Sequence, residues 1–224
     1  MNAPLPAAVL WDMDGTLIDS ERYWIAAEER LFRDHGLHWG EDDAFRMVGL
    51  GLWDAAEYMR ARGIPMSADD IVWLLVDRVA ADLGDLVPWR PGARELVAAI
   101  HEAGIPQAIV TMSVRRLAEA VAQEAPHGAL STIVAGEEVS EPKPHPEPYL
   151  RGAQALGVEP GRALAFEDSV PGVTSAHAAG LITIGVPNIV PLDAAPAHEL
   201  WQTLDGRTVA DLAHAVARLR PGAA

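Results

Sequence analysis

The sequence predicts an α/β fold in which a parallel β-sheet carries helices on both faces and an all-helical domain is inserted near the N-terminus. From residue 92 onward, strand and helix patterns alternate with short links, which is typical of a parallel sheet. Residues 21–84 instead show helical periodicity and no strand pattern. A chain of 224 residues is long enough for one domain with a large insertion.

The inserted block begins directly after an apolar strand at residues 7–11. Glycines at positions 36 and 63 end two of its helices, and Ser67 is a suitable N-cap for the last one. We expect helices at residues 21–35, 45–48, 54–62 and 67–83. The insertion therefore occupies residues 19–87.

The rest of the chain forms the predicted sheet domain, residues 1–18 and 88–224. Its expected helices are 92–103, 114–124, 146–156, 172–179 and 208–219. Its expected strands are the first strand together with 106–111, 132–135, 163–166 and 181–186. The proline-rich stretch 187–207 is expected to be irregular.

Composition restricts the partners that the protein can have. The net charge of −15 argues against nucleic acid or an anionic membrane surface. There is no cysteine, so disulfides and thiolate chemistry are excluded. The N-terminal segment lacks the pattern of a signal peptide, and no apolar run reaches the ~20 residues of a membrane span. We expect a cytoplasmic protein, with a monomer as the default.

Two acidic pairs follow two of the predicted strands. Asp12 and Asp14 come after the first strand, and Glu167 and Asp168 come after strand 163–166. Carboxylates can serve simply as turn residues at such junctions. Close carboxylates repel one another, however, and carboxylates with backbone carbonyls are ligands that Mg²⁺ prefers. Asp12, Asp168 and the Asp14 carbonyl would suit a magnesium ion.

A hydroxyl group and a single lysine occur at further positions where chemistry is expected. Thr111, Met112 and Ser113 lie between a strand and a helix, where exposed N–H groups can bind phosphate, although Thr and Ser also serve there as caps. Lys143 is the one lysine among 17 basic residues and lies in a proline-rich segment. A solvated loop lysine is the alternative, but its retention in an arginine-rich chain favours a role for a compact ammonium.

Four motifs in this order, residues 12–16 (DMDGT), Thr111, Lys143 and Glu167–Asp168, give the chain a clear resemblance. It resembles the haloacid dehalogenase superfamily, in the branch with a helical cap after the first strand. The resemblance covers nearly the whole chain. It implies a Rossmann-like core and Mg²⁺-dependent phosphoryl transfer through an aspartyl-phosphate.

The resemblance also implies the roles of individual residues. Asp12 is expected to be the nucleophile and Asp14 the general acid and base, with Lys143 and Thr111 holding the phosphoryl oxygens. The metal site is expected at Asp12, Asp14, Asp168 and Glu167, where Glu167 supports the other ligands. Expected substrate-binding residues are Gly15, Thr16, Met112 and Ser113 in the core and Asp19, Trp24, Leu52 and Trp53 in the cap.

Departures from related enzymes indicate a phosphatase. Asp14 is present, unlike in dehalogenases, and the cap contains no lysine for a Schiff base. Trp24 and Leu52 stand where β-phosphoglucomutase carries a histidine and a phosphate-binding arginine. We therefore expect hydrolysis of a small phosphorylated metabolite, such as a sugar or polyol phosphate. A phosphomutase and a non-catalytic protein that binds a phosphorylated ligand are the alternatives.

Overall fold

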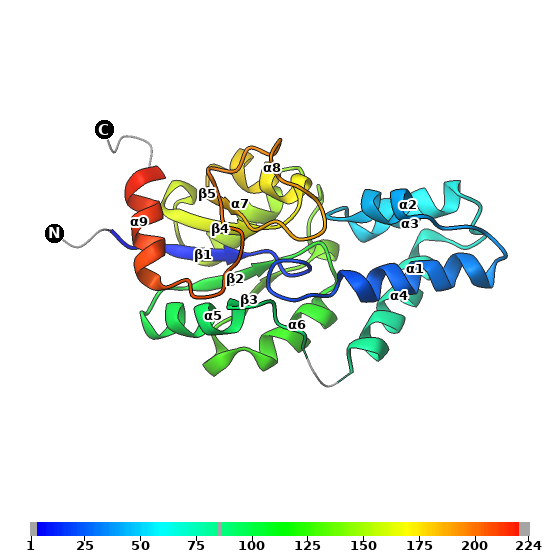
Figure 1. Ribbon diagram of the computed structural model, residues 1–224, viewed down its shortest axis with the longest axis horizontal. Coiled ribbons are helices and arrows are strands. Elements are labelled where there is room, and N and C mark those ends of the chain that lie inside the picture. Colours follow the sequence, from blue (N-terminus) through cyan, green and yellow to red (C-terminus); the bar gives the residue numbers. More distant parts are fainter. Residues whose placement is uncertain (1–3, 85–86, 220–224) are drawn as a thin grey trace.

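The computed structural model, which describes residues 4–84 and 87–219, contains one six-stranded sheet (Figure 1). All its strand pairs are parallel, and the order is β3-β2-β1-β4-β5-β6. The strands are β1 (Ala8–Trp11), β2 (Gln107–Val110), β3 (Thr132–Val134), β4 (Ala163–Glu167), β5 (Ile182–Gly185) and β6 (Glu199–Leu200). The predicted fold class is confirmed.

Helices cover both faces of this sheet. Figure 1 shows α5 (Ala93–Glu102) and α6 (Arg115–Glu124) on one side, and α7 (Glu147–Ala155) and α8 (Val170–Ala178) on the other. Successive side chains of β1 point to opposite faces of the sheet. Val9 and Trp11 belong to one buried hydrophobic cluster, whereas Ala8 and Leu10 belong to the other. The final helix, α9 (Val209–Leu219), packs with α5 in the first cluster. Burial on both faces explains why the central strands are mostly apolar.

The insertion between β1 and β2 is helical, as predicted. It consists of α1 (Glu21–Asp34), α2 (Glu41–Met47), α3 (Leu52–Ala61) and α4 (Ala68–Leu83), with α1 and α3 packed on α4. The Ser67 hydroxyl accepts the Asp70 N–H at 3.1 Å and so caps α4. The division into a core of 1–18 and 88–224 and a cap of 19–87 stays a prediction. Residues 1–3, 85–86 and 220–224 of these ranges lie outside the described residues.

Most elements agree with the expected ranges to within two residues, and two differ more than that. Helix α2 begins at Glu41 rather than at residue 45, because the Asp43 carboxylate accepts the Gly40 N–H at 3.1 Å and fixes an earlier start. The stretch expected to be irregular contains β6, which pairs with β5 through the bond from the Trp201 N–H to the Gly185 carbonyl, 2.8 Å. A two-residue strand is too short to produce a period-2 pattern.

The sheet topology brings the ends of β1, β2 and β4 together. From β1 the sheet is extended on one side by β2 and β3 and on the other side by β4, β5 and β6. The strand order thus reverses its direction at β1, and α/β sheets bind ligands in the crevice at such a switch point. Trp11 and Phe166, paired across β1 and β4, stack with ring centroids 4.4 Å apart. Just beyond them, the Asp12 N–H donates to the Phe166 carbonyl at 3.0 Å, so Asp12 lies beside Glu167.

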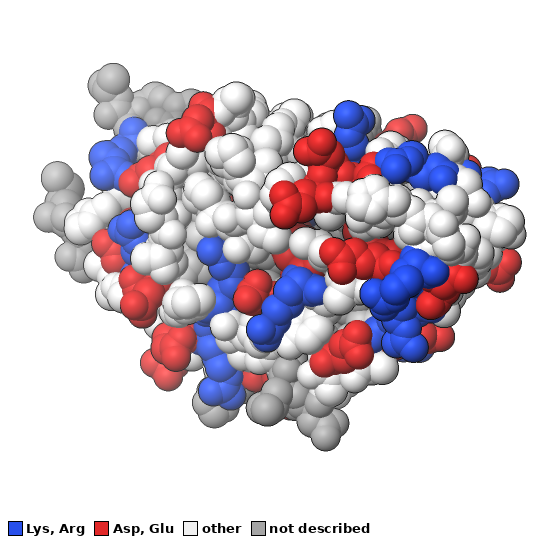
Figure 2. All heavy atoms as spheres, turned by 45° about the vertical axis from the view of Figure 1, so that its right-hand side comes forward, with Lys and Arg blue, Asp and Glu red and all other residues white. Residues whose placement is uncertain are grey.

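On the surface, acidic and basic side chains are interspersed. Figure 2 shows carboxylates and arginines side by side over this face, on the core as well as on the cap. Among the described helices, none has both the length and the apolar character required to cross a membrane.

We predict that Gly92→Ala destabilises the protein more than Gly36→Ala does. Both glycines have a positive φ, +79° and +69°, which costs an alanine about 1 kcal/mol. Only at Gly92 would the added Cβ overlap backbone, that of Leu204 and Asp205, which adds roughly 2 kcal/mol of overpacking. Urea unfolding of both variants measures the difference. Equal losses of stability would contradict the packing described here.

Candidate active site

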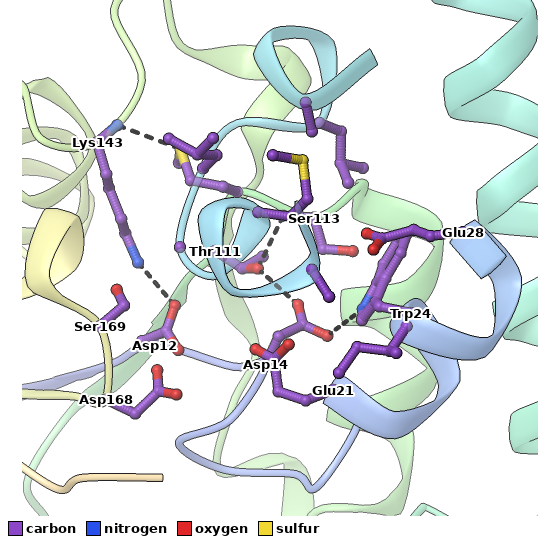
Figure 3. Close-up of a pocket in the computed structure, with 18 residues that line it drawn as sticks. Asp12, Asp14, Glu21, Trp24, Glu28, Thr111, Ser113, Lys143, Asp168 and Ser169 are labelled. Atoms are coloured by element: carbon purple, nitrogen blue, oxygen red, sulfur yellow. Dashed lines mark hydrogen bonds and ion pairs between the residues drawn. The ribbon is translucent and has the colours of Figure 1, made fainter. Parts of the chain in front are cut away.

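Side chains from four core segments and from the cap line one pocket at the carboxyl edge of the sheet. Figure 3 shows Asp12 and Asp14 from the turn after β1, Thr111 after β2 and Lys143 from the loop before α7, with Asp168 after β4. The structure thus brings the four predicted motifs together. Helix α1 closes the pocket from the cap side with Trp24 and two glutamates.

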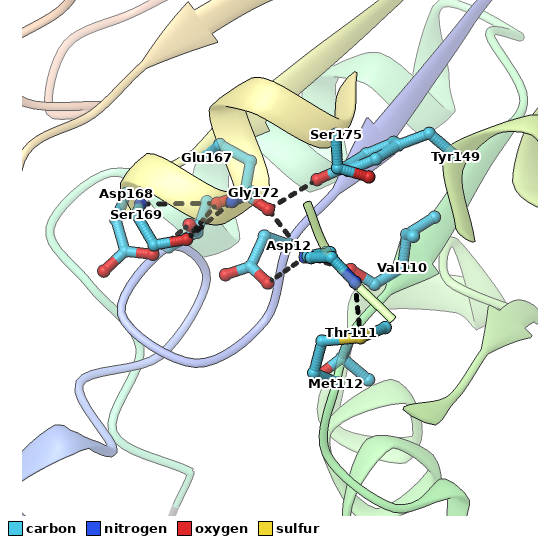
Figure 4. Close-up of polar contacts among 12 residues, drawn as sticks. Asp12, Val110, Thr111, Met112, Tyr149, Glu167, Asp168, Ser169, Gly172 and Ser175 are labelled. Carbon is cyan, nitrogen blue, oxygen red and sulfur yellow. Dashed lines mark hydrogen bonds and ion pairs between the residues drawn. The ribbon is translucent and has the colours of Figure 1, made fainter. Parts of the chain in front are cut away.

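Asp12, Glu167 and Tyr149 belong to a buried polar cluster (Figure 4), and Lys143 lies at its centre. Lys143 is 2 % exposed, and its Nζ donates to Asp12 Oδ1 at 2.7 Å, Glu167 Oε1 at 2.6 Å and the Val110 carbonyl at 3.0 Å. Burial alone would lower the pKa of Lys143, but the charges of Asp12 and Glu167 outweigh burial and raise it above its ordinary value. Lys143 therefore stays protonated. The alternative interpretation, in which Lys143 is a solvated loop lysine, is wrong.

Glu167 is fully occupied by the protein itself. Its Oε1 accepts the Tyr149 hydroxyl at 2.8 Å in addition to Lys143, and its Oε2 accepts the Ser169 hydroxyl at 3.0 Å. Gly172 lies so close that an added Cβ would overlap the Glu167 carboxylate. This arrangement suits a residue that positions Lys143 better than one that binds a metal directly.

Two other carboxylate oxygens of the site differ from those of Glu167 in their hydrogen bonding. Among the described residues, Asp12 Oδ2 and Asp168 Oδ2 are buried without any hydrogen-bond partner. Asp12, Glu167 and Asp168 can place ligand oxygens within 4.8 Å of one another. Burial, with the negative charge of Glu167, raises the pKa of Asp12 to about 7. Burial, with Asp12 and Glu167, raises the pKa of Asp168 well above its ordinary value. Unpaired oxygens of this kind fit a hard divalent cation such as Mg²⁺.

The turn after Asp14 is built around Asp168. Gly15 has φ +83°, and a Cβ there would overlap the Asp168 carboxylate, so glycine is required on both counts. The Thr16 hydroxyl donates to Asp168 Oδ1 at 3.3 Å. The Arg90 guanidinium donates to the Gly15 carbonyl and, at 3.2 Å, to that of Val186. Gly15 and Thr16 thus support Asp168 rather than line the pocket.

The Asp14 carboxylate faces the pocket and is held from three sides. Its Oδ1 accepts the Ser20 hydroxyl at 2.6 Å and the Trp24 indole N–H at 3.0 Å, and its Oδ2 accepts the Thr111 hydroxyl at 3.4 Å. Burial raises the pKa of Asp14, and these hydrogen bonds offset part of the rise. Trp24 therefore joins the cap to the chemistry of the core.

The segment after β2 offers polar groups to an anion. Thr111 Oγ1 accepts the Ser113 N–H at 2.9 Å, which fixes the start of this loop. Within the described part of the chain, the Ser113 hydroxyl is buried and unpartnered. Met112 also lines the pocket. The loop thus holds a free donor in the same pocket as the free oxygens of Asp12 and Asp168.

The cap residues expected at the site separate into two groups. Trp24 and Leu52 line the pocket. Asp19 is exposed, and Trp53 lines a neighbouring crevice, where its indole N–H donates to Asp69 at 2.7 Å. The structure does not bring these last two to the pocket.

Sequence reasoning missed several residues of the site. Tyr149 donates a hydrogen bond to Glu167, and Arg90 donates one to the Gly15 carbonyl. No local sequence pattern distinguishes either residue. Glu21 and Glu28 could have been found, because they share helical spacing with Trp24 and so lie on the face of α1 that is buried.

Comparison with known proteins gives consistent matches. Residues 6–180 match the model of the haloacid dehalogenase-like hydrolase family. Hexitol phosphatase A of Escherichia coli (strain K12) is 34% identical over 79% of this chain and 81% of its own length. Validoxylamine A 7'-phosphate phosphatase of Streptomyces hygroscopicus subsp. limoneus is 31% identical, over 79% and 84%. The crystal structure of a CbbY mutant from Rhodobacter sphaeroides in complex with xylulose-(1,5)bisphosphate superposes with TM-score 0.79 at 27% identity, covering 90% and 96%.

We predict that Glu28→Gln stabilises the protein, and more so at high pH. Burial raises the pKa of Glu28 to about 8; the nearby Glu21 and Glu29 raise it further, and a hydrogen bond from Trp39 lowers it. Because this folded pKa exceeds the ordinary value of 4.5, Glu28 in the wild type loses stabilising free energy as the pH rises from 4.5 through about 8. The glutamine does not titrate. The advantage of the variant in urea unfolding should grow by about 2 kcal/mol between pH 6 and pH 8.5.

An exposed glutamate that does not act on Glu28 supplies the control for this measurement. Glu124→Gln on α6 should change the free energy of unfolding equally at both pH values. A Glu28→Gln advantage that does not vary with pH would show that Glu28 is ionised throughout, contrary to the raised pKa.

Proposed function

The chain belongs to the haloacid dehalogenase-like hydrolases, and on that basis we propose that it hydrolyses the phosphate monoester of a small sugar or polyol. We propose further that the reaction passes through a covalent phosphate ester of Asp12. Two relatives that bear the name of phosphatase, one for hexitols, support the substrate class.

One observation carries the proposal: of the five buried side-chain atoms without a hydrogen-bond partner among the described residues, three belong to residues that line this pocket. Asp12 Oδ2, Asp168 Oδ2 and Ser113 Oγ are buried without partners, in the part of the chain that the structure describes, and all three residues line the pocket. An unpaired buried polar group is costly, so three such atoms in one pocket support the binding of a ligand there. Two anionic oxygens and a hydroxyl suit a cation bound together with a phosphate group.

In the first step, a carboxylate oxygen of Asp12 forms a bond to phosphorus while the bond from phosphorus to the leaving oxygen breaks. Lys143, 2.7 Å from Asp12 Oδ1, restrains the carboxylate so that it stays oriented for attack. Asp14 gives its proton to the leaving oxygen. The Trp24 and Ser20 bonds hold the Asp14 carboxyl in the pocket for that transfer.

In the second step, a water molecule attacks the same phosphorus. Asp14, now ionised, takes the proton of that water, and the bond from phosphorus to Asp12 breaks to release phosphate and restore the carboxylate. The Ser113 hydroxyl offers a hydrogen bond to the phosphoryl oxygens. The Lys143 ammonium, whose three N–H groups bind Asp12, Glu167 and the Val110 carbonyl, offers its positive charge. Mg²⁺ bound by Asp12 and Asp168 would neutralise charge on those oxygens.

The lining of the pocket favours a monophosphate. Among the described residues that line it, Lys143 is the only lysine or arginine, and its ammonium is already shared between Asp12 and Glu167. A second phosphate, as in the ligand of the CbbY complex or in a phosphomutase cycle, would find no partner there. Leu52 and Trp24 offer an apolar wall instead.

We predict that Asp12→Asn lowers kcat by roughly a thousandfold or more on any phosphate ester that the wild type hydrolyses, because an amide is a poor nucleophile. Phosphate release from a panel of sugar and polyol phosphates measures this. Activity should also disappear in EDTA and return with Mg²⁺.

The exposed Asp193 provides a matched control, since Asp193→Asn should retain full activity. Unchanged turnover by Asp12→Asn would contradict the assignment of the nucleophile. Absence of phosphate release from every ester, with folded wild-type protein and Mg²⁺, would contradict the proposed function.

A further inference from the structure

Helix α1 aims two buried carboxylates into the pocket that the proposed reaction does not use. Glu21 and Glu28 lie two helical turns apart and so share one face of the helix. They are 8 % and 4 % exposed, and both line the pocket. Figure 3 shows them on the cap side, on either side of Trp24.

The two carboxylates are poorly satisfied by the protein. Glu28 Oε2 accepts the Trp39 indole N–H at 3.1 Å, and no residue that the structure describes donates to its other oxygen. Glu21 accepts no hydrogen bond from the described residues, and the charged groups that act on it, Asp14, Asp12 and Asp19, are all acidic. Each carboxylate therefore has bonding capacity left inside the pocket.

The surroundings of Glu28 offer no compensating charge. Apart from Glu21, Trp24 and Glu28, the described cap residues that line the pocket carry no polar side chain: Ile25, Ala44, Met47, Gly49, Leu50, Leu52 and Ala55. The pocket's one lysine is held at the far end by Asp12 and Glu167. A buried carboxylate without a cation is destabilising, and the raised pKa of Glu28 expresses that cost. We therefore expect the part of the pocket that receives the leaving group to prefer substrates that can bind the Glu28 carboxylate.

We propose that Glu28, assisted by Glu21, is a subsite for a positively charged nitrogen on the leaving group. The substrate is then the phosphate ester of an amino alcohol, such as an amino sugar. This inference rests on the proposed function and names its substrate class. An ammonium group supplies both N–H donors and the missing positive charge, whereas a hydroxyl supplies a donor alone. A second anionic group would be repelled.

The test compares esters that differ in one substituent. Glucosamine 6-phosphate is paired with glucose 6-phosphate, and glucosamine 1-phosphate with glucose 1-phosphate, so that the nitrogen is presented at two distances from phosphorus. In at least one pair the wild type should favour the amine in kcat/KM by about tenfold, the value of a charge-assisted hydrogen bond. Glu28→Gln, which keeps an acceptor for Trp39, should bring that ratio close to one, mainly through KM.

The exposed Glu29 supplies the matched variant, since Glu29→Gln should keep the wild-type ratio. The subsite is overturned if both pairs show equal or reversed preference, or if the preference survives in Glu28→Gln. p-Nitrophenyl phosphate, which has no amine, separates the two claims. Its hydrolysis without amine preference would overturn the subsite alone, whereas failure to hydrolyse any ester would overturn the phosphatase and the subsite with it.

Discussion

The buried contact of Lys143 with Asp12 and Glu167 is the constraint on which the rest of the site depends. One ammonium group ties together the ends of three neighbouring strands, since it also donates to the Val110 carbonyl of β2. Around it, Asp12, Glu167 and Asp168 are at most 7 % exposed. Buried carboxylates this close repel one another strongly, so removal of the one central cation would leave uncompensated charge in the core. The arrangement orients Asp12 and, through Tyr149 and Ser169, fixes Glu167 as the support of the lysine.

The fold divides the proposed work between its two parts. The parallel sheet supplies every group placed around phosphorus, because its strand ends converge at one edge. The cap supplies the wall for the leaving group, and Trp24 of α1 reaches across to Asp14, the residue proposed to protonate that group. A change in the cap can therefore alter which ester is recognised without rebuilding the reaction centre. The buried Glu28 fits this division, because its raised pKa indicates a cost to the fold and it lines the pocket in which we place the leaving group.

Much of this could be predicted from the sequence because the signals are local. Apolar strands that end in Asp12, Thr111 and Asp168 predicted both the parallel sheet and the convergence of these residues, and the arginine-rich background singled out Lys143. Tyr149 and Arg90 could not be predicted, since each meets its partner only through tertiary packing. Trp53 shows the limit of helical spacing: it lies one residue from Leu52, yet its indole turns to Asp69. The two-residue β6 depends on pairing with β5, which leaves no pattern in the sequence.

The covalent role of Asp12 is the central claim, and the stereochemistry of hydrolysis at phosphorus tests it most directly. A substrate made chiral at phosphorus with sulfur and oxygen isotopes is hydrolysed in isotopically labelled water, and the configuration of the released thiophosphate is determined. Each in-line displacement inverts phosphorus, so transfer to Asp12 and then to water predicts overall retention. Overall inversion would mean that water attacks the substrate directly, and it would contradict the account.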